Sequence, residues 1–260
     1  MKKVVFKICL WALLLMGYSF TQAQSKNIII SDDLAATAEV FKVKMGTQWM
    51  GKIWKFKFGD YAVVKSKLGW TVTTEKTNLL DTRTENKTEN KFSFVLSNKT
   101  SDSAIVNAMN NITIKELRSF WIFSNNNFEF NIGSDELLMS ASFFSSFITT
   151  SSNKNDVWVL QLEQTDGSEV DYKYEGVIGN ENRIIKIVPV SSNINGIDSR
   201  MLPALGFEFI ENEQSICAVQ YFGGGAFGFN KNIVWIKSEL EPRMKLILSA
   251  AMTCLMQLKN

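Results

Sequence analysis

The segment Met244–Leu258 constrains the fold of this chain more than any other. Placed on a helix, its apolar residues fall on every side, so the helix must be buried all round. At about fifteen residues it is too short to cross a bilayer, which needs roughly twenty. Ser238 and Glu241 have the spacing of a capping box, and Pro242 suits a first helical turn. We therefore expect a C-terminal helix that the rest of the chain encloses.

Most of the chain from Thr37 to this helix alternates apolar and polar residues, which is typical of half-buried strands. Turn residues such as Gly59-Asp60 and Asp166-Gly167 separate alternating runs and predict antiparallel hairpins. The expected strands number about a dozen: Val40–Met45, Ile53–Phe58, Tyr61–Lys67, Trp70–Thr74, Lys91–Leu96, Phe128–Ile132, Val157–Glu163, Glu169–Val177, Arg183–Val190, Phe207–Ile210, Ser215–Phe222 and Ile233–Lys237.

Two segments depart from this alternation. Residues 78–90 are polar and charged, and we interpret them as an exposed loop; residues 135–152 match neither period and are left as strand or short helix. No linker divides residues 24–260, which predicts a single domain. The expected fold is mainly β, with about twelve antiparallel strands forming a closed or nearly closed barrel around the apolar C-terminal helix.

The final strand, the segment after it and the helix resemble the tubby C-terminal-like superfamily, which includes the phospholipid scramblases. The residues concerned are Ile233–Ile236, Ser238–Glu241 and Lys245–Leu258. The resemblance implies about twelve strands closed around a central apolar helix, and it is associated with binding to lipid headgroups or membrane surfaces. No binding motif of that superfamily, cysteine-rich run or set of calcium-loop acids maps onto this chain.

The first 23 residues have the pattern of a signal peptide. Lys2 and Lys3 precede an apolar run from Val4 to Phe20 that only Lys7 interrupts, and Ala23 is a small residue at the expected cleavage position. We therefore expect export to the periplasm, the cell envelope or the extracellular space. Cys217 and Cys254 remain in the mature chain, either as buried thiols or as a disulfide.

The absence of histidine limits the possible chemistry. It excludes a Ser-His-Asp triad and removes the commonest metal ligand, so the sequence predicts no metal site, no cofactor and no catalytic residues. Several acids lie in pairs or clusters. Two carboxylates that the fold holds across a cleft at the right separation can hydrolyse a glycosidic bond. The paired and clustered acids are Asp32-Asp33, Asp135-Glu136, Glu239 with Glu241, and the group Glu208, Glu211 and Glu213.

Gly223–Gly228 matches the letters of a dinucleotide-binding loop. That motif requires a strand before it and a helix after it, whereas here a strand is expected to follow, so we interpret the glycines as a hairpin loop.

Charge is concentrated near the start of the mature chain. Between residues 42 and 67 lie seven Lys and one Asp, a net charge of +6, whereas the mature chain as a whole has 25 Lys+Arg against 26 Asp+Glu, a net charge of −1. The members of each pair two residues apart point to one side of their strand, so neighbouring strands would gather the pairs into a basic face. The six candidate residues for binding an anion or lipid are Lys42, Lys44, Lys55, Lys57, Lys65 and Lys67.

These features together predict an exported, non-enzymatic envelope protein whose basic face binds acidic lipid or another polyanion. The modest net charge does not favour nucleic acid as the partner. Two alternatives are a carrier that encloses an apolar ligand within its sheet and a hydrolase that uses carboxylates. Lysines that only keep the outer side of the strands soluble would account for the same pattern.

Overall fold

The computed structural model describes residues 27–48, 50–77, 83–99, 102–117, 120–125, 128–132, 136–168, 170, 173–192, 203–223 and 232–259. The predicted signal peptide, residues 1–23, lies outside the described residues. The fold is mainly β, as predicted. Its main body is one antiparallel sheet of 14 strands, rather than about twelve, with a second sheet of two strands.

The strands of the large sheet differ widely in length. They are β1 (Ala38–Lys42), β2 (Lys44–Met45), β3 (Phe56–Phe58), β4 (Tyr61–Leu68), β5 (Val72–Thr77), β6 (Arg83–Ser97), β7 (Ser103–Leu117), β10 (Glu136–Thr150), β11 (Trp158–Asp166), β12 (Lys173–Gly179), β13 (Ile184–Ser191), β14 (Leu205–Glu211), β15 (Gln214–Phe222) and β16 (Ile233–Lys237). The small sheet pairs β8 (Phe120–Asn125) with β9 (Phe128–Ile132), and the helices are α2 (Asp32–Thr37) and α3 (Pro242–Lys259).

One continuous segment, residues 38–46, brings the two ends of the sheet together. β1 pairs with β16 along its whole length, and the Val43 amide then donates to the Asn232 carbonyl at 2.9 Å. The chain next changes partner, so that β2 pairs with β3 and the Gly46 amide donates to the Lys55 carbonyl at 3.0 Å. Because the same segment bonds to both ends, the sheet is a nearly closed barrel.

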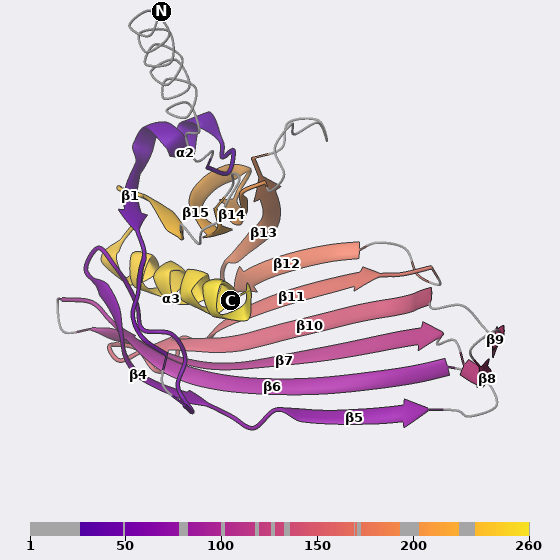
Figure 1. Ribbon diagram of the computed structural model, residues 1–260. Helices are drawn as coiled ribbons and strands as arrows, with labels where there is room; N and C mark the ends of the chain where they lie inside the picture. Colours follow the sequence, from indigo (N-terminus) through magenta and orange to yellow (C-terminus); the bar gives the residue numbers. More distant parts are fainter. Residues whose placement is uncertain are drawn as a thin grey trace, which may run out of the picture.

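Helix α3 occupies the inside of this barrel (Figure 1). Every residue from Leu246 to Met256 is buried, which places all sides of the helix against protein. The helix contacts β15 on one side and β7 and β10 on another, and these strands are well separated in the sheet order. The prediction of an enclosed C-terminal helix is therefore confirmed.

The start of the helix differs from the prediction in one respect. Pro242 is the first helical residue, as expected, but Ser238 does not form a capping box with Glu241. The Ser238 hydroxyl instead donates to the Thr37 carbonyl at 2.8 Å, which ties the β16–α3 turn to the end of α2. The Glu241 carbonyl accepts the first helical bond, from the Lys245 amide at 2.9 Å.

Strands β14 to β16 are buried on both faces. Their inner side packs on α3, and their outer side is covered by residues 27–37, whose Ile28 and Leu34 pack against Ala218 and Trp235. The Ile28 amide also donates to the Gln220 side chain at 3.0 Å. Burial on both sides explains why these strands read as continuous apolar runs rather than as an alternation.

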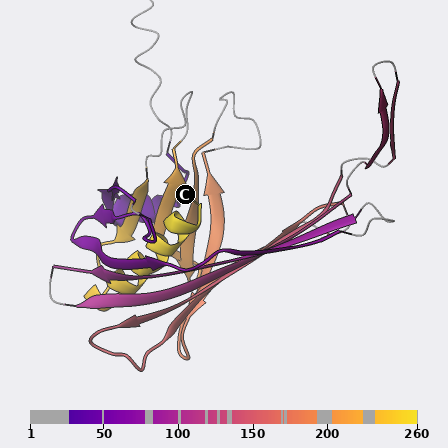
Figure 2. The same cartoon turned by 60° about the horizontal axis from the view of Figure 1, so that its bottom comes forward.

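Six strands run beyond the barrel as a single layer, which we call the projecting sheet (Figures 1 and 2). It consists of β5 and the far parts of β6, β7, β10, β11 and β12, and no described helix covers either of its faces. All residues of β5 are exposed, and residues 85–90 of β6 are half-buried or exposed on both faces.

The projecting sheet corrects two predictions. Residues 83–90 belong to β6 and are not a loop, and the whole of β7 was not predicted. Residues 85–90 of β6 have water on both faces and need no apolar side, so the alternation on which the prediction depended is absent there. Strand β7 does alternate, with Ala104, Val106 and Ala108 buried, and the prediction overlooked it. Within the ambiguous segment 135–152, residues 136–150 form strand β10.

Three further features of the sequence can be compared with the structure: the cysteines, membrane-spanning helices and metal sites. Cys217 and Cys254 are both free and buried, which answers the question of a disulfide between them. No helix among the described residues is long and apolar enough to cross a membrane. Within the same residues, no three His, Cys, Asp or Glu side chains are grouped to hold a metal ion.

Candidate functional site

The six lysines singled out in the sequence lie on the outer wall of the barrel, and we call them the lysine face. β2, β3 and β4 are consecutive in the sheet, and β2 continues directly from β1. Gly59, at a φ of 52°, makes the turn that sets β4 beside β3. All six side chains are exposed, while their neighbours Phe56, Phe58 and Val63 point into the barrel and pack in the core.

The register brings two of these lysines into direct opposition. Lys44 on β2 is the cross-strand partner of Lys57 on β3, and Lys55 lies two residues before Lys57. Residues directly opposite on one face have Cβ atoms about 5 Å apart, so two positive charges at these positions repel each other. The prediction that neighbouring strands gather the lysines on one side is correct in its geometry; the binding role of these residues stays a prediction.

The acids near this face do not neutralise it. Within the described part of the chain, no carboxylate forms an ion pair with any of the six lysines. Asp60 pairs with Lys99. Glu39 points to the inner side of β1 and pairs with Lys245 of α3 at 2.8 Å. The lysine face therefore keeps its full positive charge.

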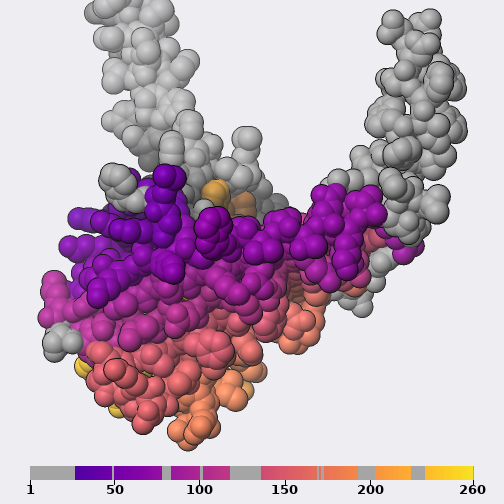
Figure 3. Space-filling model, turned by 90° about the horizontal axis from the view of Figure 1, so that it is seen from below, coloured from indigo at the N-terminus to yellow at the C-terminus, as the bar shows by residue number. Residues whose placement is uncertain are grey.

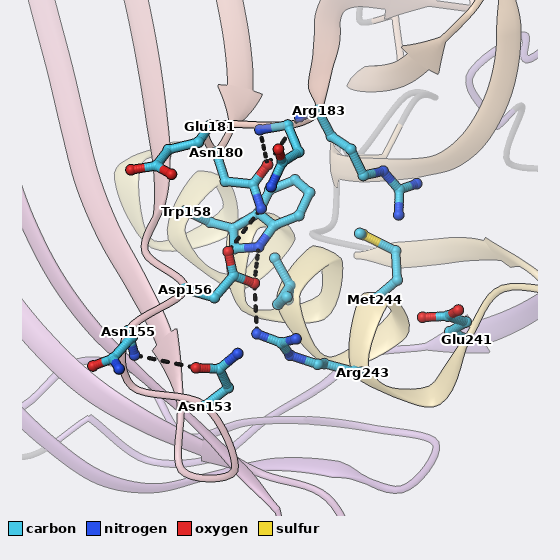
Figure 4. Close-up of a pocket in the computed structure, with 12 residues that line it drawn as sticks. Asn153, Asn155, Asp156, Trp158, Asn180, Glu181, Arg183, Glu241, Arg243 and Met244 are labelled. Carbon is cyan, nitrogen blue, oxygen red and sulfur yellow. Dashed lines mark hydrogen bonds and ion pairs between the residues drawn. The ribbon is translucent and has the colours of Figure 1, made fainter.

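A second candidate site is a polar cavity of about 460 Å³ at one end of the barrel, which we call the mouth pocket. It lies where α3 begins, between the β10–β11 connection and the β12–β13 turn (Figure 4). Asp156 is at its centre: its carboxylate accepts from Trp158 Nε1 at 3.0 Å, from Asn180 Nδ2 at 2.7 Å and from Arg243 at 2.5 Å. A second arginine, Arg183, donates twice to Glu211, at 2.8 and 2.6 Å.

Asp156 and Arg243 form an ion pair in the mouth pocket, and Glu181 and Glu241 add two further carboxylates to its lining. Burial raises the pKa of Asp156, but the hydrogen bonds from Asn180 and Trp158 and the charge of Arg243 outweigh it, so that its pKa is lowered. The pKa of Arg183 is raised, chiefly by its hydrogen bonds to Glu211. Each arginine thus has a carboxylate partner. Arg243 of α3 pairs with Asp156 of the β10–β11 connection, and Arg183 of the β12–β13 turn pairs with Glu211 of β14. The contacts made by Asp156 fasten the first turn of α3 to the barrel wall.

Sequence reasoning considered Glu241, which lines the mouth pocket, as one of the paired acids, but it did not associate it with Asp156, Arg183 or Arg243. Asp156 and Arg243 are 87 positions apart, and Arg183 and Glu211 are 28 apart. The pairing of β13 with β14 sets Arg183 beside Glu211, and the packing of α3 inside the barrel sets Arg243 beside Asp156. No local spacing in the sequence signals either pair.

Several of the acids considered for hydrolysis have contacts that stabilise the fold. Glu208 is buried and accepts from the Ser31 amide at 2.9 Å and the Ser215 hydroxyl at 2.6 Å. Asp33 and Glu239 both pair with Lys237, at 3.2 and 3.3 Å. Asp135 lies outside the described residues.

The predicted glycine hairpin loop falls mostly on residues that the structure does not describe. Gly224–Gly228 lie outside the described residues, but β15 and β16 on either side pair antiparallel, as a hairpin requires. Trp54, in the predicted strand Ile53–Phe58, packs against the core.

Comparison with known proteins gives no relative for this chain. No family model, curated protein or solved structure matches it. The resemblance to the tubby C-terminal-like superfamily stays a prediction, and the functional argument depends on the geometry described above.

Proposed function

We propose that this chain is an exported, non-enzymatic envelope protein that binds an anionic surface, acidic lipid or another polyanion, through the lysine face. The observation that carries the proposal is the opposition of Lys44 and Lys57 without a described carboxylate partner. Like charges at directly opposite positions destabilise a sheet. An anionic partner outside the molecule would attract both ammonium groups and so offset their mutual repulsion.

The size of the attraction is sufficient for reversible binding. Each Lys near an anionic membrane surface contributes roughly 1 kcal/mol, so six contribute about 6 kcal/mol. That free energy corresponds to about a 10⁴-fold preference for the surface over solution. The attraction decays within a Debye length of about 8 Å at physiological ionic strength, so binding should weaken as salt is added.

The interior of the barrel favours this proposal over the alternative of an enclosed apolar ligand. Consecutive residues of α3, from Leu246 to Met256, are buried against the surrounding strands. The space that a carrier would offer to its ligand is therefore taken by the protein's own helix. Surface binding needs no such space.

Flotation of residues 24–260 with liposomes tests the proposal. The protein should float with anionic vesicles at low salt, float less at moderate salt, and stay at the bottom with neutral vesicles. A variant that reverses four charges of the lysine face should lose flotation; its substitutions are Lys42→Glu, Lys44→Glu, Lys55→Glu and Lys57→Glu.

A matched control changes the net charge by the same amount at exposed lysines elsewhere. Its substitutions are Lys76→Glu, Lys87→Glu, Lys154→Glu and Lys186→Glu. The control should keep most of the binding. If both variants lose binding equally, net charge alone explains the result, and if neither does, the lysines only keep the strands soluble.

A further inference from the structure

Exposed apolar side chains lie on the same outer wall as the lysine face. They belong to β4, β7 and β10, and we call them the outer apolar patch: Val64, Ile105, Phe143 and Phe147. Phe147 is 53% exposed although both its sequence neighbours, Ser146 and Ile148, are fully buried. Because side chains alternate along a strand, Phe147 points outward from the barrel.

The register places this patch next to the lysines. Lys67, Ser93, Asn107 and Phe147 are successive cross-strand partners on β4, β6, β7 and β10. Three strand spacings separate Lys67 from Phe147, a distance of roughly 14 Å along the wall. Figure 3 views the face that these neighbouring strands form, coloured from violet to salmon.

A shallow groove of about 370 Å³ joins the lysine face to the outer apolar patch. Small residues on its floor, Ser93 and Ser145, lie between the larger side chains of Lys67, Met109 and Phe147. This volume is within the range of small-ligand sites. The groove therefore offers apolar walls with an ammonium group of the lysine face at one end.

Trp70 is a fifth exposed apolar residue, next to the groove. Trp70 comes immediately after Gly69, which lines the groove, and its side chain is 92% exposed. The Gly69 amide donates to the Lys91 carbonyl at 2.7 Å, which holds this turn against β6. Tryptophan is enriched where proteins meet the membrane–water interface, because its ring is apolar and its N–H is polar.

We infer that the anionic surface is a lipid bilayer, and that Trp70 and Phe147 enter its interface while the lysine face contacts the phosphates. The inference rests on the proposed function and identifies its partner. A soluble polyanion offers negative charge but nothing apolar for Phe147 to contact. A bilayer offers both, because its headgroup phosphates border an apolar region within a few ångströms.

Two ligands distinguish the inference from simple charge attraction. Binding of residues 24–260 is measured to vesicles that contain phosphatidylglycerol and, separately, to heparin as a soluble polyanion. The double variant Trp70→Ser/Phe147→Ser should bind the vesicles at least about tenfold more weakly and bind heparin as the unchanged protein does. The four-lysine variant should lose both.

A matched control removes an exposed apolar residue elsewhere. Ile184→Ser, on β13, changes a side chain that is 71% exposed and should alter neither kind of binding. Thermal melting of all variants confirms that they fold. In a direct readout, the fluorescence of Trp70 should shift to the blue on adding vesicles, and the shift should be smaller in Trp70→Phe.

Each failure has a separate meaning. If the double variant binds vesicles as tightly as the unchanged protein while the lysine variant does not, the apolar residues stay outside the bilayer and the inference is wrong, although the proposed function stands. Binding to heparin without binding to vesicles also overturns the inference. A change from dimer to monomer in the double variant, without a change in vesicle binding, would assign the patch to a second copy of the chain. If the four-lysine variant still binds both the vesicles and heparin, the proposed function is wrong as well.

Discussion

Leu248→Ala tests whether α3 is enclosed by the barrel. Leu248 is fully buried in the middle of the helix, between Ile247 and Ser249, which are also buried. The substitution removes three carbon atoms, a loss of about 2.4 kcal/mol of transfer free energy at roughly 0.8 kcal/mol per methylene. A cavity that surrounding strands cannot collapse adds to this, so we expect a total of about 3 to 5 kcal/mol.

Urea unfolding followed by circular dichroism measures this loss. With an m-value of about 3 kcal/mol/M, the midpoint should fall by at least about 1 M while the m-value stays the same. Leu258→Ala is the matched control, because Leu258 is in the same helix but only half-buried near its end. We expect a loss of about 1 kcal/mol there.

The comparison of the two variants decides the outcome. Helix propensity changes equally in both, so their difference reports only the surroundings of each side chain. If both variants lower the urea midpoint by the same small amount, Leu248 is no more buried than Leu258. The description of α3 as a fully enclosed helix would then be wrong.

Two other predictions concern titratable groups. Because the pKa of Asp156 is lower in the folded protein than in the unfolded chain, its stabilisation is complete above the unfolded value of about 3.9 and is lost as the pH falls through the folded value. Asp156→Asn should therefore lower the free energy of unfolding at pH 7, and the difference from the unchanged protein should shrink as the pH falls below about 4; a difference that is constant with pH would contradict the argument. Burial raises the pKa of the Cys254 thiol to about 12 and that of Cys217 well above its ordinary value. Neither thiol should react with a thiol reagent at pH 8 until denaturant is added, and rapid labelling of the native protein would show that the interior opens.

The sequence predicted several strands that have one covered face, but it missed β7, in which Ala104, Val106 and Ala108 are buried in alternation. In Ile53–Phe58 the apolar residues alternate with lysines because the barrel core lies on one side and water on the other, and β3 has that pattern of burial. The C-terminal helix was predicted for a related reason, since apolar residues on all its sides leave only a fully enclosed position.

The pattern gave no such information where both faces of a strand have the same surroundings. Residues 85–90 of β6 have water on both faces, so their sequence is polar throughout and resembles a loop. Strand β16 is covered on both faces, by α3 and by residues 27–37, and its sequence is apolar throughout. Ile233–Lys237 was predicted as a strand and is β16, whereas the part of β6 in the projecting sheet was interpreted as a loop.

The sequence by itself determined which residues face outward on each strand, because side chains alternate with a period of two whatever the partner. That is why the six lysines could be named before their positions were known. Only the tertiary structure decided which strands are neighbours: it set Lys44 opposite Lys57, brought Phe147 into the same row as Lys67, and joined Asp156 to Arg243. The physical reason is that alternation is a local property of the backbone. Which residues of different strands lie side by side depends on the register of the strands and the closure of the barrel, and both depend on the whole chain.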